Sequence, residues 1–144
     1  MGKSVSKILG VVVIVLVVIF AGIQLIRPSV TNHNPPVVQE PAWPSPRVRE
    51  LAQRACFDCH SNETVWPWYS QIAPVSWLVA NDVVGGRDAF NFSDWGAGHP
   101  GADQFGEEIA EGGMPLPIYL IMHPSARFSE AEKQELISGL AALR

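Results

Sequence analysis

Residues 46–60 have the sequence PRVRELAQRACFDCH, which predicts a helix that ends at a group of chemically reactive side chains. Pro46 suits the first turn of a helix, where its missing N–H group is not needed for a hydrogen bond. Apolar side chains then recur at helical spacing, at Val48, Leu51, Ala52 and Ala55. We expect this helix to bury its apolar face and to bring the residues that follow it to a site.

The last five residues of this stretch form the motif Cys56-x-x-Cys59-His60. Two thiols at this spacing can bond to the two vinyl groups of one haem, and the adjacent imidazole can ligate its iron. One covalent c-type haem is therefore the interpretation that we favour. The alternatives are a zinc site completed by His99 and His123, a thioredoxin-like redox pair, and a plain disulfide.

A six-coordinate iron needs a second axial ligand, and the sequence around Met114 favours this residue. Gly112-Gly113 before it and Pro115 after it predict an extended loop that can bring a thioether to the iron. A His/Met ligand pair raises the reduction potential of the haem relative to a His/His pair, and it suits electron transfer. We predict His60 and Met114 as the iron ligands. The other candidates are Met122, which we expect in the core, and His123, His99 and His33.

The rest of the chain predicts helices and no strand. We expect a helix from Pro74 that stops at Gly85-Gly86, a third helix over about residues 102–111, and a short helical piece within residues 118–123. Ser129 and Glu132 form a capping box that marks the start of the last helix. The domain over residues 47–144 is thus predicted to be all-α. Its aromatic side chains are expected to pack on the haem and in the core, namely Trp66, Trp68, Tyr69, Trp77 and Trp95.

Residues 8–26, ILGVVVIVLVVIFAGIQLI, contain no charge and one polar side chain, Gln24. A helix of this length rises about 1.5 Å per residue and reaches the roughly 30 Å of a bilayer's hydrocarbon core. We predict a single N-terminal transmembrane helix within residues 1–27, with a cleaved signal peptide as the alternative. Lys3 and Lys7 favour a cytoplasmic N-terminus, which places the remaining chain on the periplasmic or extracytoplasmic side of the cell (inner) membrane.

Residues 28–46 contain six prolines, which predict an extended linker. Trp43 either stays exposed in this linker or folds back on the domain. From Pro28 onward 14 carboxylates oppose 7 basic side chains, a formal charge of −7. This charge argues against nucleic acid as a partner and leaves a basic redox protein open.

Two longer segments carry a family resemblance. Residues 56–95, CFDCHSNETVWPWYSQIAPVSWLVANDVVGGRDAFNFSDW, followed by residues 112–136, GGMPLPIYLIMHPSARFSEAEKQEL, resemble the bacterial haem-binding domain family related to cytochrome c. The resemblance covers about residues 47–143. It implies a cytochrome-c-like helical fold around one haem, with thioether bonds at Cys56 and Cys59, His60 as the proximal ligand and Met114 as the distal ligand.

One attachment motif with a methionine candidate, and no catalytic constellation, predicts a membrane-tethered mono-haem cytochrome that carries single electrons and is not an enzyme. Two alternatives remain open. The first is a haem-based sensor or peroxidase-like protein, and the second is an accessory haem subunit of a membrane complex.

Overall fold

The computed structural model describes residues 2–97 and 102–143, and this part of the chain is all-helical. The only strand-like feature in the described ranges is an isolated bridge between Gln39 and Asp94. The chain divides into two compact units. Unit 1 comprises the residues up to His33 together with residues 66–81, and unit 2 comprises residues 34–65 and the chain from Asp82 onward.

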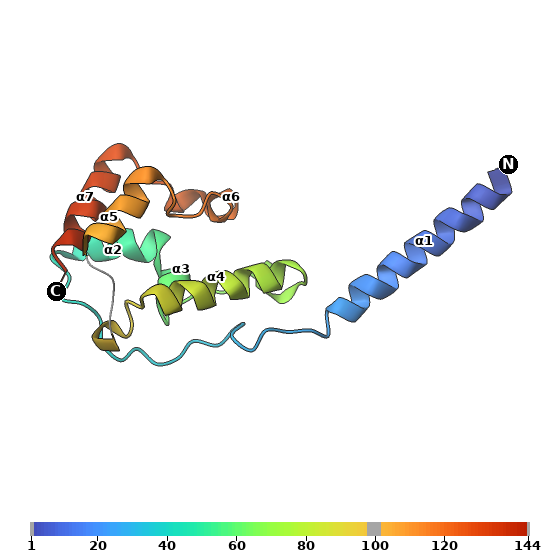
Figure 1. The fold of residues 1–144 in the computed structure, drawn as a ribbon, viewed down its shortest axis with the longest axis horizontal. Helices are drawn as coiled ribbons and strands as arrows, with labels where there is room; N and C mark the ends of the chain where they lie inside the picture. The colour runs from blue at the N-terminus through green and yellow to red at the C-terminus, as the bar shows by residue number, and fades with distance from the viewer. Residues whose placement is uncertain (1, 98–101, 144) are drawn as a thin grey trace. The chain divides into compact units, whose positions relative to one another are not determined.

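Unit 1 contains the long apolar helix α1, Gly2–Ile23, which is drawn in blue in Figure 1. From Ser4 to Ile23 its mean hydropathy is 2.8 and none of it is buried, so it is long and apolar enough to cross a membrane. The helix ends three residues before the predicted limit at residue 26. Unit 1 also holds the 3-10 helix η1, Trp68–Gln71, and the first half of α4, Val75–Ala89.

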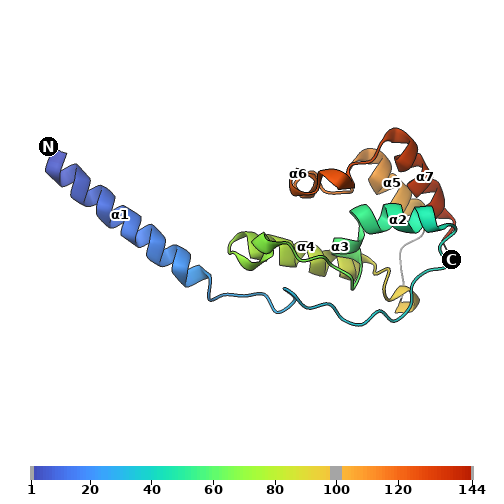
Figure 2. The same ribbon diagram turned by 180° about the vertical axis from the view of Figure 1, so that it is seen from behind.

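Unit 2 contains the remaining elements. They are α2 (Pro46–Ala55), α3 (Phe57–His60), the second half of α4, η2 (Trp95–Ala97), α5 (Ala102–Glu111), α6 (Tyr119–Met122), η3 (Pro124–Ala126) and α7 (Glu130–Ala141). Helices α5 and α7 lie side by side, and α2 packs against α7 (Figures 1 and 2). Their contact faces form the core with Val48, Leu51, Ala52, Phe57, Phe92, Trp95, Phe105, Ile109, Leu136, Leu140 and Leu143. The predicted apolar face of α2 is therefore confirmed.

Side-chain caps are present at the start of α2, where the sequence predicts only Pro46 in the first turn, and at the start of α7, where a capping box is predicted. The side chain of Ser45 accepts a hydrogen bond from Val48 N at 3.2 Å and caps α2. At the start of α7, Ser129 and Glu132 form the capping box reciprocally, as the sequence predicts. These polar contacts fix the residues at which α2 and α7 begin. The first residue of each helix in turn determines which side chains lie on the face that contacts the other helix.

Helix α4 contradicts the sequence prediction at its end. It continues through Gly85 and Gly86 to Ala89 instead of stopping at the glycines. A Cβ at Gly86 would lie 2.5 Å from the carbonyl oxygen of Cys59, whereas a Cβ at Gly85 would meet nothing within 4 Å. Gly86 thus allows α4 to approach the Cys59 backbone closely, and the pair is not a helix stop.

Residues 33–43 of the Pro-rich segment are extended, as predicted, whereas residues 29–32 form turns. From Asn34 onward the segment belongs to unit 2 and is held against the rest of that unit. The Asn34 side chain donates to the Thr64 carbonyl at 2.9 Å. The Trp43 ring lies with its centroid 5.1 Å from that of Phe92 and 6.1 Å from that of Phe57. Of the two expectations for Trp43, the one in which it folds back on the domain is confirmed.

Candidate functional site

The Cys-x-x-Cys-His motif forms one tight turn at the junction of α2 and α3. The carbonyl of Cys56 accepts hydrogen bonds from Cys59 N at 3.2 Å and from His60 N at 2.8 Å. Both thiols are free and partly buried. Burial, followed by the neighbouring Cys59, raises the pKa of the Cys56 thiol to about 12, and burial with nearby Asp82 and Asp58 does the same for Cys59. Both thiols of this turn are therefore protonated at neutral pH.

The raised pKa of both thiols argues against one alternative interpretation, because a redox pair of the thioredoxin kind depends on a thiolate with a lowered pKa. The zinc interpretation needs further ligands, and the described residues contain no group of three or more His, Cys, Asp or Glu side chains that could hold a metal ion. His99, one of the proposed zinc ligands, lies outside the described residues.

The imidazole of His60 is buried, with 8% of the residue exposed. It stacks on the Phe90 ring with centroids 4.1 Å apart and planes inclined by 13°. Burial lowers the pKa of His60, an effect that the nearby backbone of Phe90 and Gly86 partly opposes. Its Nδ1 atom is buried and makes no hydrogen bond. A neutral, oriented imidazole that the protein leaves incompletely bonded suits the role of a ligand.

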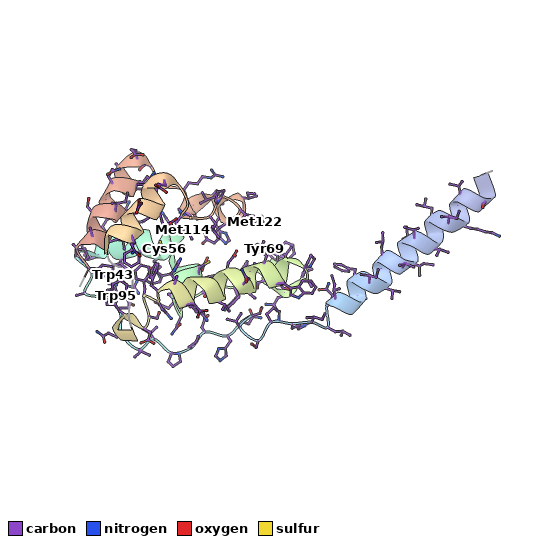
Figure 3. All side chains as sticks on the ribbon, viewed as in Figure 1. Trp43, Cys56, Tyr69, Trp95, Met114 and Met122 are labelled. Atoms are coloured by element: carbon purple, nitrogen blue, oxygen red, sulfur yellow. The ribbon has the colours of Figure 1, made fainter. Side chains whose placement is uncertain are left out.

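A cavity of about 520 Å³ opens beside this turn. Its lining includes Cys56, His60, Phe90, Phe105, Met114 and Phe128 and is largely apolar. This volume lies within the range of roughly 300–1,000 Å³ that is typical of cofactor and ligand pockets. Three of the four predicted site residues, Cys56, His60 and Met114, thus line one cavity. Cys56 and Met114 are labelled in Figure 3. Cys59 is not among the described residues that line the cavity.

The end of α5 sets the position of Met114. Gly112 has a φ of +80°, which glycine adopts without strain, and its N–H bonds to Ile109 O at 3.2 Å while Gly113 N bonds to Glu108 O at 2.9 Å. This pair of bonds is a Schellman cap. Met114 N also bonds to Glu108 O at 3.1 Å, so the methionine follows directly from the cap. Its side chain is 37% exposed, in contrast to the buried His60.

Comparison with known sequences identifies the family. The sequence model of the haem-binding domain family matches residues 18–142. The chain belongs to the haem-binding domain family. A search of curated proteins and a search of solved structures found no match. The family predicted from the two sequence segments is confirmed, while its relation to cytochrome c stays a prediction.

The site geometry fits the haem that members of a haem-binding domain family bind. The cavity is apolar enough for a porphyrin, the buried imidazole of His60 is neutral, and the Met114 thioether lies on the same cavity. The residues that would hold the haem are Cys56 and Cys59 through their thiols, and His60 and Met114 through the iron. These assignments remain predictions.

The other ligand candidates that lie in the described residues, Met122, His123 and His33, are not among the residues that line the cavity. Met122, expected in the core, lies on α6 and is 53% exposed, so that expectation is wrong. His123 stacks on the Tyr119 ring with centroids 3.9 Å apart. His33 is exposed in unit 1, and His99 lies outside the described residues. Met114 is the one methionine that the described structure brings to the cavity with His60.

Polar contacts that the sequence did not predict fix the loop after His60. Phe92 N donates to the His60 carbonyl at 2.8 Å, and Asn62 N donates to Ser93 Oγ at 2.9 Å. The Asn91 side chain donates to that of Asn62 at 2.9 Å. Residues 60–62 and residues 91–93 are therefore direct hydrogen-bonding partners. Both segments belong to the sequence that carries the family resemblance, but nothing in the sequence indicates that they contact each other.

Asp58, inside the motif, links the turn to α6. Its carboxylate accepts hydrogen bonds from the Tyr119 hydroxyl at 2.7 Å and from Val65 N at 2.9 Å, and its carbonyl accepts from Thr64 Oγ1 at 2.8 Å. Burial, together with Asp58, raises the pKa of Tyr119, which stays protonated. Tyr119 thus ties the cysteine turn to the segment that follows Met114.

Arg87, at the end of α4, holds the same loop from the other side. Its Nε donates to the Ser61 carbonyl at 2.8 Å, and its Nη2 donates to Thr64 Oγ1 at 3.0 Å and to Asn34 Oδ1 at 3.1 Å. Burial lowers the pKa of this guanidinium. Arg87 is therefore a structural clamp on the loop after His60.

Proposed function

We propose that this haem-binding protein is a membrane-tethered c-type cytochrome that carries single electrons. The observation that carries the proposal is the meeting of a thiol, a neutral imidazole and a thioether on one largely apolar cavity, from Cys56, His60 and Met114. In this proposal the chain has no enzymatic role. The formal charge of −7 from Pro28 onward supports a redox protein partner with a basic contact surface.

In this proposal Cys56 and Cys59 hold the haem through two thioether bonds, and His60 and Met114 are the axial ligands. When bound, the haem supplies an iron that cycles between the ferric and ferrous states. The chain supplies the rest. Phe90 orients the His60 ring, and burial keeps that ring unprotonated at neutral pH. The apolar lining limits the access of water, and a His/Met pair raises the reduction potential relative to a His/His pair.

The tether in this proposal is helix α1. Its length and hydropathy support a single crossing of the cell membrane. Lys3 and Lys7 at its start support a cytoplasmic N-terminus, with the haem domain on the periplasmic or extracytoplasmic side. Because c-type haem is attached on the outer side of the membrane, this orientation agrees with the proposed covalent haem at Cys56 and Cys59.

Extraction and mass spectrometry test the attachment. Protein matured in a host with a haem-attachment system is extracted with acid acetone, and the polypeptide is weighed intact. We expect haem colour and one haem mass to stay with the chain, and to be lost in the variant with Cys56→Ala and Cys59→Ala. Polypeptide with two bare or mutually bonded thiols would overturn the covalent assignment.

Two methionines provide a matched test of ligation. Met114→Ala is expected to abolish the sulfur-to-iron charge-transfer band of the ferric protein and to lower the reduction potential. Met122→Ala removes an exposed methionine that does not line the cavity, so it should leave both unchanged. An unchanged band in Met114→Ala would reject Met114 as the ligand.

The exposure of Met114 favours a second candidate, a haem-based sensor or peroxidase-like protein. A thioether that is 37% exposed, on a loop, can be displaced more easily than a buried one. In that case the ferrous protein binds carbon monoxide readily, and Met114→Ala raises peroxidase activity only slightly because the wild type is already active. A ferrous protein that resists carbon monoxide supports electron transfer.

A further inference from the structure

Residues 66–81, WPWYSQIAPVSWLVAN, contain three tryptophans and a tyrosine but no charged side chain. The segment belongs to unit 1, and its small side chains, such as Ser70 and Ala73, are buried whereas several large apolar ones are not. Trp68 is 71% exposed, Leu78 and Val75 are each 43% exposed, and Ile72 is 37% exposed. An uncharged stretch that exposes several large apolar side chains is unusual on a water-facing surface and marks an interaction site.

Hydrogen bonds join this segment to the end of α1. The Gln24 side chain donates from Nε2 to Ala73 O at 3.1 Å and accepts from Ala73 N at 2.9 Å through Oε1. Trp77 Nε1 donates to the Ile26 carbonyl at 2.8 Å. All three bonds lie within unit 1, directly after the last residue of α1, Ile23.

These bonds set the depth of the segment once α1 crosses a bilayer. The candidate membrane span in α1, Ser4–Ile23, is 20 residues long, and at about 1.5 Å per residue it matches the roughly 30 Å hydrocarbon core. Gln24 and Ile26 then lie at the boundary between the hydrocarbon core and the headgroup layer. Groups hydrogen-bonded to them, Ala73 and Trp77, lie at the same depth.

We propose that residues 66–81 form an interfacial anchor whose exposed aromatic and aliphatic side chains insert into the headgroup and upper acyl region of the outer leaflet. This inference rests on the membrane tether in the proposed function. Tryptophan and tyrosine favour that layer because each has an apolar ring and a polar N–H or O–H group. The occupant is lipid, recognised through apolar burial and not through charge, because the segment has no charged side chain. The segment holds the start of the linker, which follows Ile26, at the membrane surface.

Spin-label depth measurements test this anchor in the full-length, haem-loaded protein reconstituted in phosphatidylcholine vesicles. Nitroxide labels are attached to Trp68→Cys, Ile72→Cys and Leu78→Cys, one at a time. Val15→Cys, in the middle of α1, is the hydrocarbon reference, and Ala131→Cys, exposed on α7, is the aqueous reference. The parent protein is the background control for Cys56 and Cys59. Haem content confirms that each variant folds, and the relaxation of each label by the ferric iron is subtracted by measuring it in the absence of both collision reagents.

We expect the ratio of oxygen to water-soluble nickel collisions to be several-fold higher at positions 68, 72 and 78 than at 131, and highest at 15. A ratio at 68, 72 and 78 equal to that at 131, with 15 still in hydrocarbon, overturns the anchor and leaves the tether intact. A water-like ratio at 15 refutes the tether and the anchor together. Low collision rates with both reagents, rising when the haem is omitted, show that haem covers this face and overturn the lipid assignment.

Discussion

Replacing Gly86 by alanine tests whether the close approach of α4 to the cysteine turn holds the site together. The added Cβ would lie 2.5 Å from Cys59 O, 2.8 Å from Cys59 C and 2.9 Å from Cys59 Cβ. Two of these three atoms are backbone, so rotation of a side chain cannot relieve the overlap. Helix α4 or the motif turn must move, and the affected residue is one of the two predicted haem attachment points.

The neighbouring glycine is a matched control that isolates this contact. Gly85 is in the same helix, and a Cβ there would meet nothing within 4 Å. Replacing glycine by alanine inside a helix stabilises it by about 0.5–1 kcal/mol, because alanine loses less backbone entropy on folding. Forcing an extra carbon into a packed contact costs about 1–3 kcal/mol. The helix-propensity gain is common to both variants, so the free energies of unfolding of Gly85→Ala and Gly86→Ala should differ by that same 1–3 kcal/mol or so.

Urea denaturation, followed by far-UV circular dichroism of the full-length protein in detergent, measures the difference. Covalent haem content and the reduction potential provide a second measurement, because a displaced turn also moves Cys59 and His60. Gly85→Ala should keep both at the wild-type level, and Gly86→Ala should lower the haem content. Gly86→Ala at least as stable as Gly85→Ala, with full haem content, would refute the close-approach explanation.

Three further predictions concern unit 2. An added Cβ at Gly139 would overlap both methyl groups of Val48, so Gly139→Ala should lower the free energy of unfolding by about 1–3 kcal/mol. Val48→Ala should recover part of this loss in the double variant, and strict additivity in urea denaturation would contradict the contact. Hydrogen bonds and charge lower the pKa of Glu132 to about 2, so its stabilisation is present above about pH 4.5 and is lost as the pH falls toward 2. The midpoint of thermal denaturation should therefore depend less on pH across this range in Glu132→Gln than in the wild type. An unchanged pH dependence would show that the lowered pKa of Glu132 does not contribute to stability. Tyr119→Phe removes a donor to the charged Asp58 carboxylate and should cost about 1–3 kcal/mol. In an Asp58→Asn background the loss should be smaller, and an equal loss would show that the two residues are not coupled.

Local patterns predicted the parts of this fold that depend on local chemistry. The spacing of Val48, Leu51, Ala52 and Ala55 gave the buried face of α2, and Ser129 with Glu132 gave the start of α7, since caps and helical periodicity involve residues within a few positions of one another. The family assignment rested on longer motifs and is confirmed by the match over residues 18–142.

The predictions that failed depend on distant partners. The pair Gly85-Gly86 is typical of a helix end, but Gly86 lies inside α4. The glycine is explained by its close approach to the backbone of Cys59, which belongs to α3. Met122 has an apolar side chain suited to a core, but the short helix α6, Tyr119–Met122, leaves it 53% exposed. Trp68 is 71% exposed and therefore does not lie in the core, so that its packing on haem stays a prediction, whereas Trp95 lies in the core.

The candidate site combines a rigid side with a less constrained side. His60 is held by the Phe90 ring, by the Phe92 N–H on its carbonyl and by the loop contacts of Asn62. Met114 is placed by a helix cap, and its side chain remains 37% exposed. Electron transfer favours ligands that keep their positions when the iron changes charge, whereas sensing or peroxidase chemistry favours a ligand that leaves. Because the His60 side is fixed in either case, the choice between the two proposed functions depends on how firmly Met114 is held. That property is set by the loop after α5 and by Tyr119, whose hydrogen bond to Asp58 joins the segment beyond this loop to the cysteine turn.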